Sequence, residues 1–140
     1  MSRVCGENVK LGKLFVKRYP YQPMEVAVTI GLIGNLQGYV VYTMEFGAAI
    51  YLASRLLDDA ILMDLDIMTQ SALSELANMI SGASATILYS IDTTIDITTP
   101  SFFHNGKPED FPFVKPATQV LCMPMHLRDG SVFEVDVVIE

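Results

Sequence analysis

The sequence has few cysteines, no long apolar run and few basic residues outside its start, and each scarcity excludes a class of protein. Cysteine occurs only at Cys5 and Cys122 in 140 residues, so no disulfide framework is expected and both thiols fit a reducing compartment. The apolar runs are short and interrupted, which predicts no membrane span. The opening segment, MSRVCGENVKLGK, lacks the apolar core of a secretory signal. We therefore expect a cytoplasmic protein.

Basic side chains are concentrated in the first 23 residues. This segment has a formal charge of +4, and the remaining chain has −11, which together give the net charge of −7. An acidic body does not suit nucleic acid, whose phosphates require dense Lys and Arg. The basic start is either an electrostatic docking patch or the solvated side of a strand.

Residue patterns of the common metal and catalytic centres are missing. His104 and His126 are isolated, and with the two cysteines they form no CxxC or HxxxH grouping of a zinc site. No glycine-rich loop ends in Lys-Ser or Lys-Thr, and no Gly-x-Ser-x-Gly elbow occurs. The four Asp residues within 58–66 lack the regular spacing of a calcium loop. The sequence thus predicts no metal site and no cofactor.

The apolar pattern predicts a single α+β domain over residues 1–140. Extended segments are expected at 13–19, 24–33, 36–44, 86–90, 91–100, 118–127 and 131–140, and helices at 46–57 and 69–85. Gly34-Asn35 and Asp129-Gly130 are typical of hairpin turns. The proline-rich segment 101–116 is predicted to be a loop, and Thr69 is a suitable N-cap for the second helix.

That second helix has two contrasting faces. At 100° per residue its apolar side chains form one buried stripe, made of Leu73, Leu76, Ala77 and Ile80. Small or polar residues occupy an arc of roughly 60° on the opposite side: Ser71, Glu75, Asn78 and Gly82. Glu75 and Asn78 are three residues apart, so their side chains are neighbours on the surface.

Taken alone, this polar face has an ordinary explanation, because most exposed Glu and Asn residues simply face water. Asn is a poor helix former, however, since its amide competes with the backbone. Asn78 costs a few tenths of a kcal/mol relative to Ala, and Gly82 costs more unless it closes the helix. Two unfavourable residues on one face suggest a use without naming it.

The spacing Ser-x3-Glu-x2-Asn-x3-Gly resembles the signature of the CheC/CheX/FliY family of chemotaxis phosphatases. The words SELANMISG are most similar to CheX, and the layout fits from about residue 11 to 140. The resemblance implies an α+β fold in which a largely antiparallel sheet carries two long helices on one face, with pseudo-duplicated halves. Such chains usually open with a further helix. Cys5-Gly6 looks like a helix end with almost nothing before it, so that helix is absent or shortened and part of one sheet face is expected to be uncovered.

What the resemblance implies about activity is a phosphatase for a phosphorylated CheY-type receiver. Asn78 would orient the attacking water, and Glu75 would pair with the receiver's active-site Lys. Ser71, Ser74 and Gly82 would contact the receiver. The Mg²⁺ would belong to the receiver, so no cofactor is expected here. The family also implies a homodimer.

Two other interpretations stay open. A non-catalytic module that binds receivers or the flagellar switch would share the fold, although a scaffold does not need the helix-weakening Asn78. A sensor of small ligands is the third interpretation, but the sequence contains no signature of a polar pocket.

Overall fold

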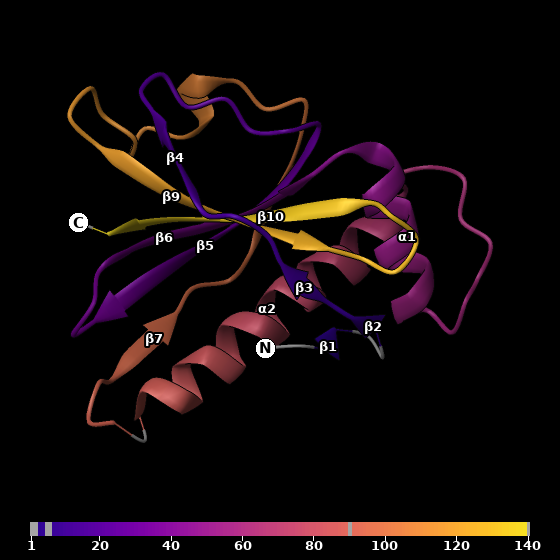
Figure 1. Cartoon of the computed structure of the whole chain (residues 1–140), viewed down its shortest axis with the longest axis horizontal. Coiled ribbons are helices and arrows are strands. Elements are labelled where there is room, and N and C mark those ends of the chain that lie inside the picture. The colour runs from indigo at the N-terminus through magenta and orange to yellow at the C-terminus, as the bar shows by residue number, and fades with distance from the viewer. Residues whose placement is uncertain (1–2, 5–6, 90, 140) are drawn as a thin grey trace.

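The chain forms a curled, antiparallel sheet with two helices (Figure 1). The computed structural model describes residues 3–4, 7–89 and 91–139. In chain order the elements are β1 (Arg3–Val4), β2 (Glu7–Asn8), β3 (Lys10–Leu11), β4 (Phe15–Arg18), β5 (Val26–Gly34), β6 (Gly38–Met44), α1 (Phe46–Leu56), α2 (Ile67–Tyr89), β7 (Ile95–Ile97), β8 (Ser101–His104), the short 3-10 helix η1 (Pro108–Asp110), β9 (Gln119–His126) and β10 (Val132–Ile139). The expected α+β class is confirmed.

The order of strands across the main sheet is symmetric. β6 and β10 pair at the centre, β5 and β9 lie outside them, and the outermost positions hold β7 with β8 on one edge and β3 with β4 on the other. The first strands of each half therefore pair with a strand of the other half: β4 with β9, and β8 with β5. This exchange ties the two halves together and agrees with the expected pseudo-duplication.

Two tight turns set the register of the long strands, as the sequence predicts. β5 and β6 form a hairpin in which Gly34 has a φ of +129°. A side chain at Gly34 would collide with the backbone of Thr94, so glycine is required there for both conformation and space. β9 and β10 form the second hairpin, closed by Leu127 N–H donating to Ser131 O at 2.9 Å.

The sheet has a core on each face. The larger core packs both helices against one side of β5, β6 and β10, and its helical members are Ala48, Ala49, Leu52, Ala53, Ala72, Leu73, Leu76 and Ala77. The smaller core lies on the opposite side, where Phe111 and Val114 from the segment after η1 cover β9 and β10 together with Tyr21. The aliphatic stripe predicted for the second helix thus faces the sheet.

The start of α2 differs from the prediction. The helix begins at Ile67, and Asp66, not Thr69, caps it: Thr69 N–H donates to Asp66 Oδ1 at 2.8 Å. This hydrogen bond is the main cause that lowers the pKa of Asp66. Thr69 is itself buried. A carboxylate accepts the free amides of a helix start more strongly than a hydroxyl does.

The predictions after α2 were wrong in two further places. Residues 86–89 continue the helix to Tyr89 instead of forming a strand. Once a helix exists, each added residue gains a hydrogen bond, and this gain exceeds the weak strand preference of these four residues. Ser101–His104, expected to be loop, is strand β8 and pairs with Val26–Thr29 of β5. The expected helix end at Cys5-Gly6 lies outside the described residues.

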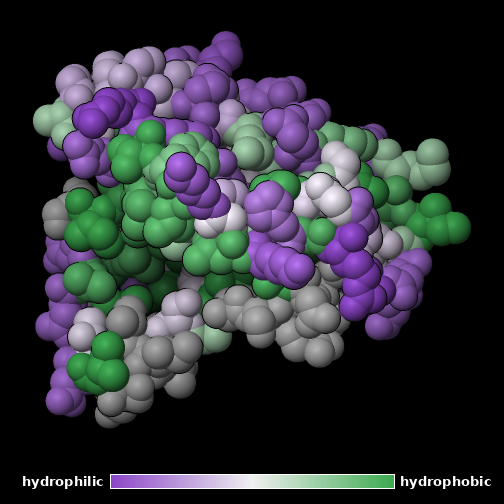
Figure 2. Space-filling model, viewed as in Figure 1, coloured by the Kyte–Doolittle hydropathy of each residue, from purple (hydrophilic) through white to green (hydrophobic). Residues whose placement is uncertain are grey.

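Part of the helix-side face of the sheet is hollow. A cavity of about 310 Å³ lies between α2 and the sheet, and its lining is Leu32, Val40, Tyr42, Ile80, Ser81, Ser84, Ile95, Met123, Met125, Val135 and Val137. Figure 2 shows hydrophobic side chains gathered around a hollow on this side of the molecule. The α2 residues that line it, Ile80, Ser81 and Ser84, project away from Glu75 at 100° per residue.

Candidate functional site

The candidate site is the outward face of α2. Glu75 and Ser71 are exposed, and Ser74, Asn78 and Gly82 are half-buried. Because residues three apart on a helix have their Cβ atoms about 5–6 Å apart, one carboxylate and one carboxamide stand side by side. Within the described part of the chain neither side chain has a hydrogen bond or ion pair. Both polar groups are therefore available to another molecule.

The opposite face of α2 holds the helix in place. Leu73, Leu76 and Ala77 are each at most 5% exposed in the main core. The hydroxyls of Ser81 and Tyr42 are 2.7 Å apart and buried, which joins α2 to β6. Burial raises the pKa of Tyr42, so its phenol stays protonated. The site is thus presented on a helix fixed by packing and by a polar contact, not on a mobile loop.

Gly82 has no packing reason to be glycine. Apart from the backbone of its own helix, a Cβ built there would meet no atom of the described residues within 4 Å, whereas at Gly34 it would collide with backbone. Glycine inside a helix costs about 1 kcal/mol relative to alanine. The open space beside Gly82 leaves room for a second surface to approach α2.

The structure therefore brings Ser71, Glu75, Asn78 and Gly82 to one accessible face, with Ser74 at its margin. Their chemical roles remain predictions. The opposite side of the sheet holds a second group of polar residues, which the sequence analysis missed.

This second group is a buried ionic cluster built on β10. Glu134 and Asp136 point to the same side of the strand, and Lys17 Nζ lies 2.7 Å from Glu134 Oε1 and 3.5 Å from Asp136 Oδ2. The Tyr21 hydroxyl donates to Asp136 Oδ2 at 2.5 Å. Burial, and then the contact with Glu134, raise the pKa of Asp136 to about 7. Two carboxyl groups thus face one ammonium.

Cys122 lies against this cluster, and burial raises the pKa of its thiol. Ligand atoms of Cys122, Glu134 and Asp136 all lie within 4.8 Å of one another, which is the one such grouping among the described residues. The Lys17 ammonium already supplies the positive charge there, so we assign the cluster a structural role. One sequence signal indicated the cluster. Val138 lies on the same side of β10 as Glu134 and Asp136, and an apolar residue at this alternating position argues against a solvent-exposed face.

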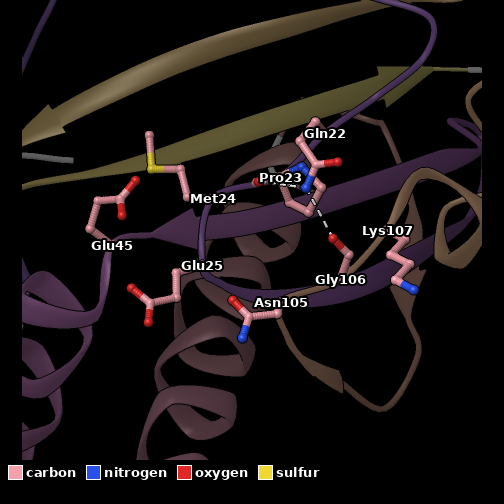
Figure 3. A pocket seen from close by; sticks show the side chains of 8 residues that line it. All are labelled: Gln22, Pro23, Met24, Glu25, Glu45, Asn105, Gly106 and Lys107. Atoms are coloured by element: carbon pink, nitrogen blue, oxygen red, sulfur yellow. Dashed lines mark hydrogen bonds between the residues drawn. The ribbon is translucent and has the colours of Figure 1, made fainter.

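A second, more open pocket lies where β5 and α1 begin (Figure 3). It has a volume of about 490 Å³ and is lined by Gln22, Pro23, Met24, Glu25, Glu45, Asn105, Gly106 and Lys107. Its polar groups serve the fold: Phe46 N–H at the start of α1 donates to Glu25 Oε1 at 3.1 Å, and Gln22 Nε2 donates to Gly106 O at 3.0 Å. His104 Nε2 lies 3.7 Å from the other Glu25 oxygen. None of the predicted site residues lines this pocket.

The protein has an α+β fold with a curled antiparallel sheet, and a Glu-x2-Asn pair lies on the outer side of one helix. This combination defines the CheC-like class of chemotaxis proteins. A family model described as chemotaxis phosphatase CheX matches residues 26–120. The chain belongs to this CheX family, which confirms the resemblance read from the sequence.

Individual relatives agree with this membership. CheY-P phosphatase CheX of Thermotoga maritima is 29% identical over 98 residues, which cover 70% of this chain and 63% of that protein. The match therefore spans less than two thirds of the relative. The crystal structure of CheX from Desulfovibrio desulfuricans superimposes with a TM-score of 0.80 at 24% identity, covering 98% of this chain and 89% of the other. For the CheX-CheY-BeF3-Mg+2 complex from Borrelia burgdorferi the TM-score is 0.75 at 28% identity, covering 95% and 84%.

No helix within the described ranges has both the length and the apolar character that crossing a membrane requires.

Proposed function

We propose that this chain accelerates hydrolysis of the aspartyl phosphate on a CheY-type response-regulator receiver. The observation that carries the proposal is the pair of Glu75 and Asn78, which points outward from a helix anchored on the sheet. Membership of the CheX family and a relative named CheY-P phosphatase support the same activity.

Asn78 is suited to position water. Its carboxamide has both a donor and an acceptor, so it can hold one water molecule in a defined direction. Hydrolysis of a phosphoryl group passes through a loose transition state, and the protein contributes chiefly by aligning the attacking oxygen with the bond that breaks. The aspartyl phosphate, the Mg²⁺ and the cleft belong to the receiver. This chain would add one amide, and it would need no metal or cofactor of its own.

Glu75 is suited to docking. As a carboxylate beside Asn78, it would pair with the Lys of the receiver's active site and so fix where the amide enters the cleft. Ser71, Ser74 and Gly82 are small, and they would let the receiver approach the helix closely.

The test is phosphate release from a phosphorylated CheY-type receiver of the same organism, measured with and without this chain. The proposal expects a faster loss of phosphate that disappears in Asn78→Ala. Stable binding with no change in rate would instead identify a non-catalytic module that binds receivers or the flagellar switch.

We also propose a homodimer, which the family resemblance implies. Light scattering at the concentrations used for the phosphatase assay measures the molar mass directly. A mass equal to one 15.4 kDa chain would contradict the dimer and leave the phosphatase proposal unaffected.

A further inference from the structure

Large apolar side chains flank the polar site face of α2. Ile67 is 82% exposed, Met68 59% and Met79 50%. At 100° per residue Ile67 projects beside Asn78, while Met68 and Met79 project beside Glu75. With a rise of 1.5 Å per residue, Met79 lies about 6 Å and Ile67 about 12 Å from Glu75 along the helix axis. Met79 thus lies next to the polar pair, and Ile67 and Met68 lie about two turns before it on the outward side of the same helix.

The apolar surface continues into the segment between the two helices. Ile61 is 91% exposed and Met63 is 82% exposed. We call Ile61, Met63, Ile67, Met68 and Met79 the flanking patch. Single exposed apolar residues are common, but a run of them along one stretch marks an interaction surface. Methionine is frequent on such surfaces because its flexible thioether adapts to the partner.

The flanking patch is held in place, so its exposure does not come from a loose segment. Leu62 and Leu65 alternate with the exposed residues and pack against the main core. Ser54 Oγ donates to Ala60 O at 2.6 Å, and Gln70 Nε2 donates to Leu65 O at 2.8 Å. The segment is therefore fixed at both ends and in the middle, and it presents Ile61 and Met63 to solvent.

Acidic side chains form a rim around this patch. The segment holds four exposed carboxylates: Asp58, Asp59, Asp64 and Asp66. Arg55 Nη1 lies 3.1 Å from Asp59 Oδ1, and one cation against four carboxylates leaves this rim with a net negative charge. A surface that matches it is apolar at its centre and basic at its edge.

We propose that the flanking patch is the docking surface for the phosphorylated receiver, whose matching surface is apolar with a basic rim. The inference rests on the function proposed above, because Met79 is next to Asn78 on the helix. A receiver that reaches Asn78 must lie over Met79, and a contact that extends about two turns along α2 from Glu75 also covers Met68. In this arrangement Asn78 orients the water, Glu75 fixes where the amide enters the cleft, and the patch supplies most of the affinity.

The test compares the double variant Met68→Ala/Met79→Ala with wild type. Alanine favours the helix more than methionine does, so the variant retains α2. Its matched control is Ile33→Ala, which removes a side chain of similar exposure, 54%, on β5 away from the site face. Two quantities are measured: steady-state phosphate release as a function of receiver concentration, and the Kd for a receiver loaded with beryllofluoride in place of phosphate.

We expect KM and Kd of the double variant to rise about tenfold, as truncation of interface anchors does, while kcat stays within about twofold of wild type because Asn78 is untouched. Ile33→Ala should leave both constants unchanged. Salt should lower kcat/KM for wild type, and less so for Asp64→Asn, because the rim is screened.

Wild-type KM and Kd in the double variant would overturn the inference while leaving the phosphatase proposal intact. A changed molar mass with normal receiver binding would also overturn it, since the patch would then contact a second copy. If wild type binds the loaded receiver without accelerating phosphate loss, the proposed function fails, and weaker binding by the double variant still supports the docking surface. If wild type does not bind, both fail.

Discussion

Tyr42 and Ser81 join the sheet to the helix that carries the candidate site, through hydroxyl oxygens 2.7 Å apart in a buried setting. The contact lies one turn from Asn78 on the inner side of α2, next to the 310 Å³ cavity. This hydrogen bond and the core residues Leu73, Leu76 and Ile80 attach this part of the helix to the sheet.

The first prediction concerns that hydrogen bond. Tyr42→Phe keeps the ring and removes the hydroxyl, and it should lower the free energy of unfolding by about 1 kcal/mol. Ser81→Ala should cost a similar amount. In urea unfolding, the loss of unfolding free energy in the double variant should be clearly smaller than the sum of the losses in the two single variants. Each of the three variants removes the same hydrogen bond. Strictly additive losses would show that the two hydroxyls do not stabilise each other.

The second prediction concerns the polar pair. Asn78→Ala should abolish the stimulated loss of phosphate and leave the melting temperature equal or slightly higher, because Ala is the better helix former. Glu75→Ala should weaken receiver binding. Glu109→Ala, an exposed acidic residue in η1, is the control for the general loss of one negative charge. Wild-type stimulation by the Asn78 variant would remove the proposed catalytic role.

The third prediction follows from the buried cluster of Lys17, Glu134 and Asp136. Burial and Glu134 raise the pKa of Asp136 from its usual 3.8 to about 7. A carboxyl whose pKa is higher in the folded state contributes stability that is fully present below the unfolded pKa and is lost as pH rises through the folded pKa. Between about pH 4 and pH 7 the titration of Asp136 should therefore lower the wild-type free energy of unfolding.

Asp136→Asn removes this titration while retaining a polar group for Tyr21 and the Lys17–Glu134 ion pair. The difference in unfolding free energy between wild type and variant should shift in favour of the variant as pH rises from 4 to 8. The groups facing Asp136 are Lys17, Tyr21, Cys122 and Glu134, and burial raises the pKa of both Tyr21 and Cys122, so neither titrates in this range. A difference independent of pH would show that Asp136 is ionised throughout.

The sequence predicts those structural elements that depend on interactions between residues close together in the chain. The β-branched runs, the Gly34 and Gly130 turns and the apolar stripe of α2 are local, and each predicted its element. The end of α2 was missed because Thr86 and Ile87 favour strands by themselves, and only an existing helix overrides them. The N-cap of α2, Asp66, could also have been predicted locally, but Thr69 was chosen instead.

The distant pairings could not be predicted in this way. Strand β8 exists because Ser101–His104 has a partner in β5, far earlier in the chain. The Lys17 and Asp136 side chains meet across 119 residues of sequence. In the candidate site, helical spacing placed Glu75 and Asn78 correctly on one outward face. The flanking patch was missed because exposure of Ile67 and Met68 is decided by how the chain enters α2, which no periodic pattern encodes.

The last prediction separates stability from activity at Gly82. Apart from the backbone of its own helix, an added methyl would meet no atom of the described residues within 4 Å. Gly82→Ala should therefore raise the free energy of unfolding by about 0.5–1 kcal/mol, through the backbone entropy that glycine loses on folding. The same methyl would stand on the face that the receiver approaches, and it should lower kcat/KM for phosphate release. Gly47→Ala is the matched control, because Gly47 lies in helix α1 and also has open space around it. That variant should gain stability without losing activity. A Gly82 variant that is more stable and fully active would show that close approach of the receiver is not the reason for this glycine.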